Sequence, residues 1–304
     1  MPDQACTAQQ LLSAGIRTTN SRQLYPTLHQ PADAGLPMLV IENALGKTVV
    51  ALQGAHVMSF QPAGQPEMLW ISPKTLLLDG TPIRGGIPVC FPQFSSQGGL
   101  PKHGFVRCKP WQVTAQRCGD DYALVTLLTE DDAATHALWS HSFELELTVM
   151  LEADTLDLEL GLSNTGEEAL SFTGALHTYL QVDAIENVRL SGLCGTNYRD
   201  SANGGREGRE AAEILTFAGE TDRIFLGASR PLSLNDGAGQ LGIAQDGFTD
   251  VVVWNPWADK GAALADLPPD GWRRMLCVEA AVAGAPLTVR PGEEWYGRQK
   301  LMAD

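Results

Sequence analysis

Residues 142–162 read SFELELTVMLEADTLDLELGL, and their alternation decides the fold class. Apolar side chains recur at every second position from Phe143 to Leu151, and they resume after a turn over Glu152–Thr155 and continue to Leu162. Most of the residues between them are acidic, threonine or glycine. A period of two is the signature of a strand with one buried face. The stretch therefore predicts an antiparallel hairpin with one face in the core and one face in water.

Short runs of the same kind recur along the chain, and the 31 glycines and 18 prolines can supply the turns between them. These predicted strands are Pro37–Ile41, Thr48–Leu52, Tyr122–Leu128, Val188–Leu193, Val251–Trp254, Met275–Ala280 and Leu287–Arg290. No long helix-period segment competes with them. The pattern predicts an all-β protein built as one large antiparallel β-sandwich. We expect a polar leader over residues 1–35, with a weakly amphipathic patch at 11–16, and a single domain over residues 36–304.

The charge of the chain is strongly negative, because 21 Lys and Arg face 36 Asp and Glu and leave a net charge of −15. A field of that sign repels nucleic acids and anionic membranes, so we expect neither as a partner. An anionic small molecule would have to be held by a local cluster of basic side chains. We expect the protein to act as a monomer.

The six cysteines are scattered along the chain without a C-x-x-C pair. That pattern indicates thiols kept reduced in a cytosol, and it does not suggest a zinc site or a disulfide scaffold. The first residues, MPDQACTAQQ, lack the basic and apolar regions of a signal peptide. No apolar run approaches the roughly 20 residues that span a bilayer. We therefore expect a cytoplasmic protein.

The stretch Arg84–Arg107, RGGIPVCFPQFSSQGGLPKHGFVR, combines two arginines and a histidine with five glycines. Glycine lets the main chain approach a ligand, and a guanidinium offers a planar fork of donors for phosphate or carboxylate. The alternative is a tight turn with solvated arginines and a structural His103. In so acidic a chain, the combination favours a pocket for an anion.

Three residues could transfer protons, namely His103, His177 in TGALHTYL, and Glu279 in the apolar run MLCVEAAV. A carboxylate in such a run either faces solvent or is buried with a raised pKa. Two interpretations stay open. One is general acid–base catalysis by imidazole and carboxylate, and the other is a His/His/Glu metal site. The lack of an H-x-H or H-x-x-x-H pair favours the first.

Two further segments could contact a sugar. In VVVWNPW, Trp257 could stack on the apolar face of a sugar and Asn255 could bond its hydroxyls, whereas we expect Trp254 in the core. The segment Glu220–Arg223 carries Asp222 and, on composition alone, resembles a surface turn. No G-x-S-x-G elbow, Walker loop or dinucleotide fingerprint is present, so the sequence gives no support to those classes of enzyme.

Taken in order, six segments resemble the aldose 1-epimerase (galactose mutarotase-like) superfamily, and most of all its branch of glucose-6-phosphate 1-epimerases. These segments are RGGIPVCFP, LPKHGFVR, ALHTYL, ETDRIF, VVVWNPW and CVEAA. The resemblance runs from about Leu36 to about Tyr296. It implies a β-supersandwich that interconverts the α and β anomers of glucose 6-phosphate without a metal or another cofactor.

The resemblance also implies roles for individual residues. Glu279 would take the proton of the C1 hydroxyl, His177 would protonate the ring oxygen, and His103 would donate to the oxygens near C1. Ring opening needs such a base and acid acting together. The contacts to ring hydroxyls and to the phosphate would come from Asp222 and from Arg84 and Arg107, respectively.

Two positions depart from this branch: Ser95, where relatives often carry glycine, and Lys102, where they often carry an uncharged polar residue. Two other functions remain open. A mutarotase for unphosphorylated aldoses is disfavoured by the two arginines. A carbohydrate-binding sandwich without turnover is disfavoured because His103, His177 and Glu279 occur together.

Overall fold

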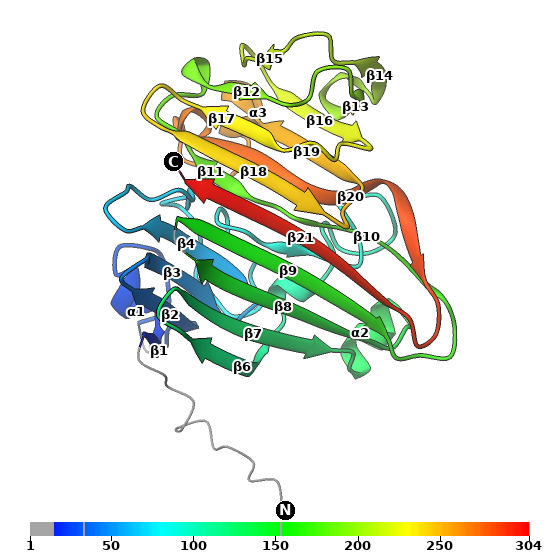
Figure 1. The fold of residues 1–304 in the computed structure, drawn as a ribbon. Helices are drawn as coiled ribbons and strands as arrows, with labels where there is room; N and C mark the ends of the chain where they lie inside the picture. Colours follow the sequence, from blue (N-terminus) through cyan, green and yellow to red (C-terminus); the bar gives the residue numbers. More distant parts are fainter. Residues whose placement is uncertain (1–14, 33, 153, 304) are drawn as a thin grey trace, which may run out of the picture.

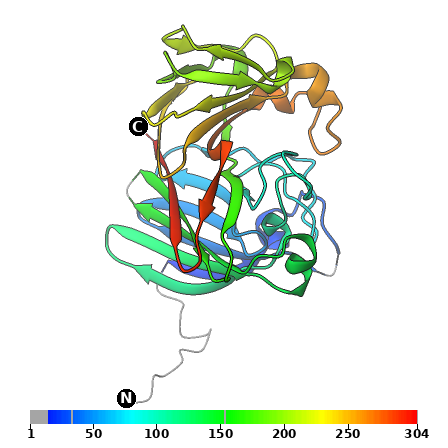
Figure 2. The same cartoon turned by 90° about the vertical axis from the view of Figure 1, so that its right-hand side faces the viewer.

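Antiparallel strands make up most of the regular structure in the computed structural model, which describes residues 15–32, 34–152 and 154–303 (Figure 1). They form sheets of nine, eight and four strands. In Figure 1 the nine-stranded sheet lies as a broad layer toward the viewer, and Figure 2 shows the other sheets behind it. The predicted all-β antiparallel fold is confirmed.

The nine-stranded sheet has the order β15-β12-β17-β18-β21-β9-β8-β7-β6. Its strands are β6 (Gln112–Cys118), β7 (Tyr122–Glu130), β8 (Phe143–Glu152), β9 (Thr155–Asn164), β12 (Arg189–Ser191), β15 (Ile214–Leu215), β17 (Leu232–Asn235), β18 (Gln240–Asp246) and β21 (Glu294–Ala303). The predicted hairpin is the pair β8 and β9, joined in register from Phe143↔Asn164 to Glu152↔Thr155. Its alternating apolar side chains are buried, as the period of two predicts.

One residue departs from the expected wet face of this hairpin. Asp157 on β9 is only 3% exposed. Its carboxylate accepts hydrogen bonds from Arg298 on the neighbouring β21, one of them at 2.6 Å, and lies 3.3 Å from Lys300 Nζ. Lys300 lies directly opposite Asp157 in the β9–β21 pair, and Arg298, opposite Glu159, is its diagonal neighbour. Two cations therefore cover this carboxylate, which compensates for its removal from water.

The four-stranded sheet has the order β1-β2-β3-β4 and follows the chain. It consists of β1 (Ile16–Asn20), β2 (Pro37–Asn43), β3 (Gly46–Ala51) and β4 (His56–Pro62), with α1 (Ser21–Leu24) after the first strand. The predicted leader over residues 1–35 is wrong in its boundary, because β1 pairs with β2 from Ile16↔Ile41 to Asn20↔Pro37. Ile16 packs in the main core. Of the amphipathic patch at 11–16, residues 11–14 lie outside the described residues.

The eight-stranded sheet has the order β14-β13-β16-β19-β20-β10-β5, with β11 also paired to β20. Its strands are β5 (Val89–Cys90), β10 (Leu170–Leu176), β11 (Tyr179–Gln181), β13 (Asn197–Asp200), β14 (Arg206–Arg209), β16 (Thr221–Leu226), β19 (Asp250–Asn255) and β20 (Met275–Val289). The two strands predicted at Met275–Ala280 and Leu287–Arg290 are a single 15-residue strand. This long strand spans the sheet's middle and carries Glu279.

One apolar cluster draws on all three sheets, for example through Phe60 on β4, Leu147 on β8 and Val253 on β19. Short helices occupy connections, namely α2 (Ala133–Leu138), α3 (Trp257–Ala262) and the 3-10 turns Val106–Cys108, Ile185–Asn187, Ser201–Asn203 and Gly271–Arg274. In Figure 2, α3 lies on the same side of the molecule as the long loops between β4 and β6. Within the described residues, no helix is long and apolar enough to cross a membrane.

Candidate active site

Three neighbouring strands place polar side chains on the face of the eight-stranded sheet opposite the main core. In register, Asp222 on β16 lies beside Trp254 on β19, and Val252 on β19 lies beside Glu279 on β20. Cross-strand partners and residues two apart share a face. Asp222, Val252, Trp254 and Glu279 therefore point to the same side. The intervening Val251 and Val253 point into the main core.

His177 lies beside this group because β10 ends at Leu176 and the chain crosses to β11. Its backbone N–H donates to the carbonyl oxygen of Pro88 at 3.0 Å. The ring stacks on Tyr179, with centroids 4.7 Å apart and planes at 10°, and meets Trp254 edge-on. His177 Nε2 lies 3.4 Å from Glu279 Oε1. The aromatic packing fixes the imidazole next to the carboxylate.

His103 comes from the glycine-rich loop and adopts a positive φ of 64°. Its backbone N–H donates to Ser95 O at 2.8 Å, and its Nδ1 accepts from the Ser95 N–H at 3.3 Å and lies 3.2 Å from Cys90 Sγ. Since a backbone N–H can only donate, the neutral ring carries its proton on Nε2. The next residue must be glycine, because a Cβ on Gly104 would lie 2.0 Å from Phe91 O. The ring centroids of His103 and His177 are 5.1 Å apart.

Burial dominates the protonation of these groups. Glu279 is 1% exposed, and burial, with a smaller contribution from Asp222, raises its pKa well above the usual range. Burial and then the nearby His103, Arg84 and Arg107 lower the pKa of His177 well below its usual value. Burial and the same kind of cationic neighbours lower the pKa of His103 to about 3. Burial therefore favours the uncharged forms of the two imidazoles and of the Glu279 carboxyl group.

Arg84 and Arg107 lie close to the same two histidines. Arg84 Nε donates to Asp266 Oδ2 at 3.0 Å, and its Nη1 donates to the Tyr179 hydroxyl at 2.9 Å. Arg107 Nη2 donates to the carbonyl oxygen of Lys102 at 2.6 Å. The buried Arg107 Nε has no hydrogen-bond partner among the described residues. An unpaired buried donor of this kind is costly unless a ligand satisfies it.

These side chains line a two-part cavity. The first part, here called the reaction lobe, has a volume of about 130 Å³, and the second, the cationic lobe, about 230 Å³. Both lobes are lined by Arg84, Lys102, His103 and His177. The reaction lobe adds Asp222, Trp254, Lys260 and Glu279, among others. The cationic lobe adds Arg107, Tyr179 and Asp266, among others.

The structure thus brings together six of the eight predicted site residues, whereas Asn255 and Trp257 line neither lobe. Asn255 is fully buried. Its Nδ2 donates to Trp272 O and Met275 O, and its Oδ1 accepts from Trp257 N–H, so its amide fixes the turn after β19. The prediction that Asn255 binds sugar is wrong. The Trp257 ring packs at a tilt of 44° against that of Trp272, with ring centroids 4.5 Å apart, away from both lobes.

Sequence reasoning missed several residues of the site. Trp254 was expected in the core, but the alternation of β19 puts it in the reaction lobe beside Val252. Tyr179 could have been found from the same alternation, since it stands two positions after His177. Lys260 lies 2.6 Å from Glu220 and 3.7 Å from Asp222, on a helix with no motif of its own. No sequence signal connects Asp266 with Arg84, because 182 positions separate them.

A metal ion is compatible with one part of the site. Ligand atoms of His177, Cys277 and Glu279, all buried, lie within 4.8 Å of one another. This differs from the His/His/Glu set considered from the sequence, because a thiol replaces His103. Burial raises the pKa of Cys277 well above its usual value, which disfavours the thiolate that binds metal.

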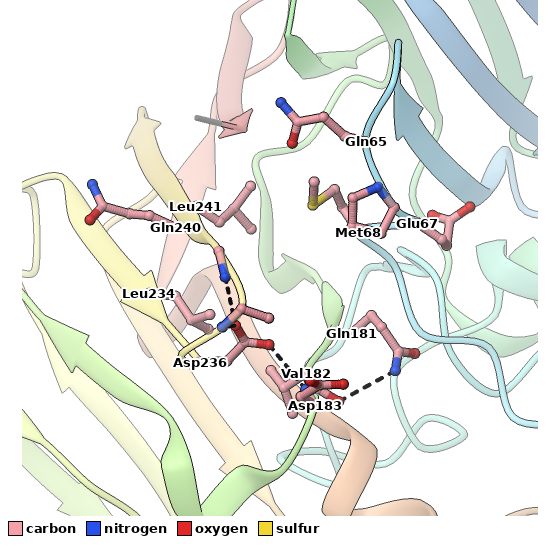
Figure 3. Close-up of a pocket in the computed structure, with 13 residues that line it drawn as sticks. Gln65, Glu67, Met68, Gln181, Val182, Asp183, Leu234, Asp236, Gln240 and Leu241 are labelled. Atoms are coloured by element: carbon pink, nitrogen blue, oxygen red, sulfur yellow. Dashed lines mark hydrogen bonds between the residues drawn. The ribbon is translucent and has the colours of Figure 1, made fainter.

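A separate cavity of about 300 Å³ lies between the β17–β18 turn and the segments at 65–68 and 181–183 (Figure 3). Two of its carboxylates are occupied by internal contacts. Asp236 accepts from the N–H groups of Asp183, Ala238 and Gly239. Glu67 accepts from Ser59, Phe60 and Leu69. Its lining holds no histidine or arginine, so the chemistry of the molecule points to the two-lobed cavity.

Comparisons with known proteins agree with this geometry. The aldose 1-epimerase family matches residues 37–302. A relative from Salmonella typhimurium, named "Putative glucose-6-phosphate 1-epimerase", is 35% identical over 268 residues, which cover 87% of this chain and 89% of the relative. One from Escherichia coli with the same name is 35% identical over 265 residues, covering 86% and 88%.

The solved structures point the same way. The crystal structure of a "putative mutarotase" from Salmonella typhimurium superposes with a TM-score of 0.82 at 32% identity, covering 88% of this chain and 90% of that one. The family match spans most of the chain, including every residue that lines the reaction lobe. This chain belongs to the aldose 1-epimerase family.

Proposed function

We propose that the protein is a hexose-6-phosphate mutarotase that interconverts the α and β anomers of glucose 6-phosphate. The observation that carries this proposal is one cavity in which a buried imidazole–carboxyl pair adjoins a lobe lined by two arginines. The pair suits proton transfer at a sugar ring, and the lobe suits an anionic group on the same molecule. The names of the relatives support glucose 6-phosphate as the substrate.

Ring opening requires a base at O1 and an acid at O5. In the proposed reaction the Glu279 carboxylate takes the proton from O1 as the C1–O5 bond breaks and C1=O1 forms. The proton on His177 Nε2 goes to O5. Rotation about C1–C2 then presents the other face of the aldehyde, and the reverse transfers close the ring. Microscopic reversibility requires the same two groups in both directions.

The electrostatics suit these roles. Burial raises the pKa of Glu279 and lowers that of His177, which favours a resting pair with the proton on the carboxyl group and a neutral imidazole. Moving that proton from Glu279 Oε1 to His177 Nε2, across 3.4 Å, yields the base and the acid that opening requires. The net charge of the pair does not change, so the transfer can occur in a site with little water. A carboxylate with a raised pKa is also a stronger base.

The neighbouring residues hold the sugar. His103, whose Nδ1 is occupied, offers its Nε2–H to the oxygens near C1. Asp222, in the reaction lobe, accepts from ring hydroxyls. Arg84 and Arg107 bind the phosphate in the cationic lobe. Binding energy from this remote group keeps the ring in a reactive pose and so contributes to turnover.

One observation favours a second candidate, a mutarotase for unphosphorylated aldoses. Arg84 already pairs with Asp266 and Tyr179, so it could serve to shape the wall. Arg107, with its unpaired Nε, favours the phosphate instead.

Exchange NMR at the anomeric protons distinguishes these functions. Rates are measured for glucose 6-phosphate, glucose and galactose, each against its spontaneous rate. Acceleration confined to the phosphorylated sugar supports the proposal. Acceleration of the free sugars alone would identify a mutarotase for unphosphorylated aldoses. If the folded protein accelerates none of the sugars, the remaining function is carbohydrate binding without turnover.

Further expectations about the protein belong to this proposal. The net charge of −15 supports a protein that binds neither nucleic acid nor membranes. Reduced thiols support a cytoplasmic location. The cluster shared by all three sheets supports a single domain, which begins by Ile16. We also propose that it acts as a monomer that needs no metal or other cofactor.

A further inference from the structure

Lys102 stands where the two lobes of the cavity meet, since its side chain lines both. It precedes His103 directly, and its carbonyl oxygen accepts from Arg107 Nη2 at 2.6 Å. The main chain of Lys102 thus ties the proposed phosphate arginine to the proposed reactive histidine.

The ammonium group of Lys102 makes no direct ion pair among the described residues. No hydrogen bond or ion pair joins its Nζ to any residue in the described ranges, in contrast to the other cations of the cavity. Lys260 is held by Glu220 and Asp222, and Arg84 by Asp266. Burial and then the charges of Arg84 and Lys260 lower the pKa of Lys102, while the carboxylate of Asp222 has a smaller, opposite effect. Cations therefore outweigh anions around this lysine.

A protein of net charge −15 has many carboxylates with which to neutralise a surface cation, yet this lysine remains unpaired. Like charges held together repel one another, and an anion placed among them relieves the repulsion. Arg107 Nε is an unsatisfied donor on the wall of the cationic lobe, and Lys102, which lines the same lobe, is exposed and holds its Nζ in no hydrogen bond or ion pair with a described residue. A phosphate dianion offers enough acceptor oxygens for both.

We propose that Lys102 is a specificity-determining residue that completes the phosphate site with Arg84 and Arg107 and raises the preference of this protein for phosphorylated over neutral sugars. The inference rests on the proposed function, since it assigns a third cation to the same site. The inference can nevertheless be tested separately from the proposed function, because binding of inorganic phosphate can be measured without any reaction.

The test compares wild-type protein with Lys102→Gln, Lys102→Arg and a matched control, Lys47→Gln. Lys47 lies on β3 and lines neither lobe, so its replacement removes one positive charge elsewhere. Calorimetric titration with inorganic phosphate gives Kd. Exchange NMR gives the ratio of kcat/KM for glucose 6-phosphate to that for glucose. Because Lys102 is exposed at the rim, we expect all variants to fold.

We expect Lys102→Gln to weaken phosphate binding about 10-fold and to lower the specificity ratio about 10-fold, the effect of one charge-assisted hydrogen bond. Lys102→Arg keeps the charge and should retain most of the phosphate affinity and of the specificity ratio. Lys47→Gln should match the wild type in both quantities. Unchanged phosphate affinity in Lys102→Gln would overturn the inference. If wild-type protein fails to accelerate glucose 6-phosphate exchange, the proposed function fails, while the phosphate titration still decides the role of Lys102.

Discussion

Glu279 and Asp157 are both carboxylates on strands and both are almost fully buried, at 1% and 3% exposed, but their surroundings differ. Asp157, on the nine-stranded sheet, is covered by Arg298 and Lys300. Glu279, on the eight-stranded sheet, has His177 3.4 Å from Oε1, and its Oε2 has no hydrogen-bond partner among the described residues. A carboxylate with a structural role is compensated by cations, whereas one left short of partners keeps the reactivity that a catalyst needs.

The largest effect should come from the imidazole beside Glu279. His177→Asn removes the proposed acid at the ring oxygen, and we expect kcat for anomer exchange of glucose 6-phosphate to fall about 1,000-fold. The matched control is His136→Asn, which breaks another His–carboxylate pair, with Asp131, at the surface. Exchange NMR on both variants checks this. Equal rates in the two would show that the buried pair has no special role.

A smaller effect on the reaction is expected in the cationic lobe. Arg84→Ala should raise KM for glucose 6-phosphate about 30-fold, because a charged hydrogen-bonding partner of the phosphate is lost. The control is Arg290→Ala, an exposed arginine whose one ion pair among the described residues is with the nearby Glu293. Kinetics with glucose as the second substrate complete the test. A rise in KM of the same size for glucose would mean that Arg84 does not read phosphate.

The other half of the comparison concerns stability. Asp157→Asn leaves Arg298 and Lys300 without their anion, and we expect the free energy of unfolding to fall by about 2 kcal/mol. Anomer exchange at a temperature where the variant is folded should stay at the wild-type rate. Denaturant unfolding monitored by circular dichroism measures the free energy of unfolding, and exchange NMR measures the rate of anomer exchange. A loss of activity in the folded variant would contradict a purely structural role for Asp157.

The smallest effect is a gain in stability, where Asp157→Asn loses it, and it concerns Glu279. Its folded-state pKa lies above the unfolded value, so its contribution to stability is full below the unfolded pKa and is lost as pH rises through the folded pKa. Glu279→Gln cannot ionise and escapes this loss. We therefore expect the variant to gain stability relative to wild type progressively as pH rises above about 4.5, the usual pKa of a glutamate in the unfolded chain. A constant difference across pH would contradict the buried, uncharged carboxyl group.

The fold could be predicted from the sequence because its strands are local patterns. The alternation from Phe143 to Leu162 needs no knowledge of distant contacts, and it places the apolar side chains correctly. The same alternation did not predict the burial of Asp157, because the cations that cover it come from β21, far along the chain. It also missed β1, whose short segment at Ile16–Asn20 carries little pattern of its own.

The site could be predicted only in part. Histidines, arginines and acidic residues were found through resemblance to a family, and the structure brings them together as expected. The errors at Asn255 and Trp257 came from choosing residues near the end of a strand without following its alternation, which selects Trp254. The contact of Arg84 with Asp266 depends on the folded chain alone, and no local pattern announces it.

The most direct test measures anomer exchange of glucose 6-phosphate by three proteins at equal concentration: wild type, Glu279→Gln and Asp157→Asn. If the unpaired buried carboxyl group is the proton acceptor, exchange by Glu279→Gln falls about 1,000-fold while Asp157→Asn keeps the wild-type rate. Near wild-type exchange by folded Glu279→Gln would contradict the account, because an amide cannot take the proton from O1.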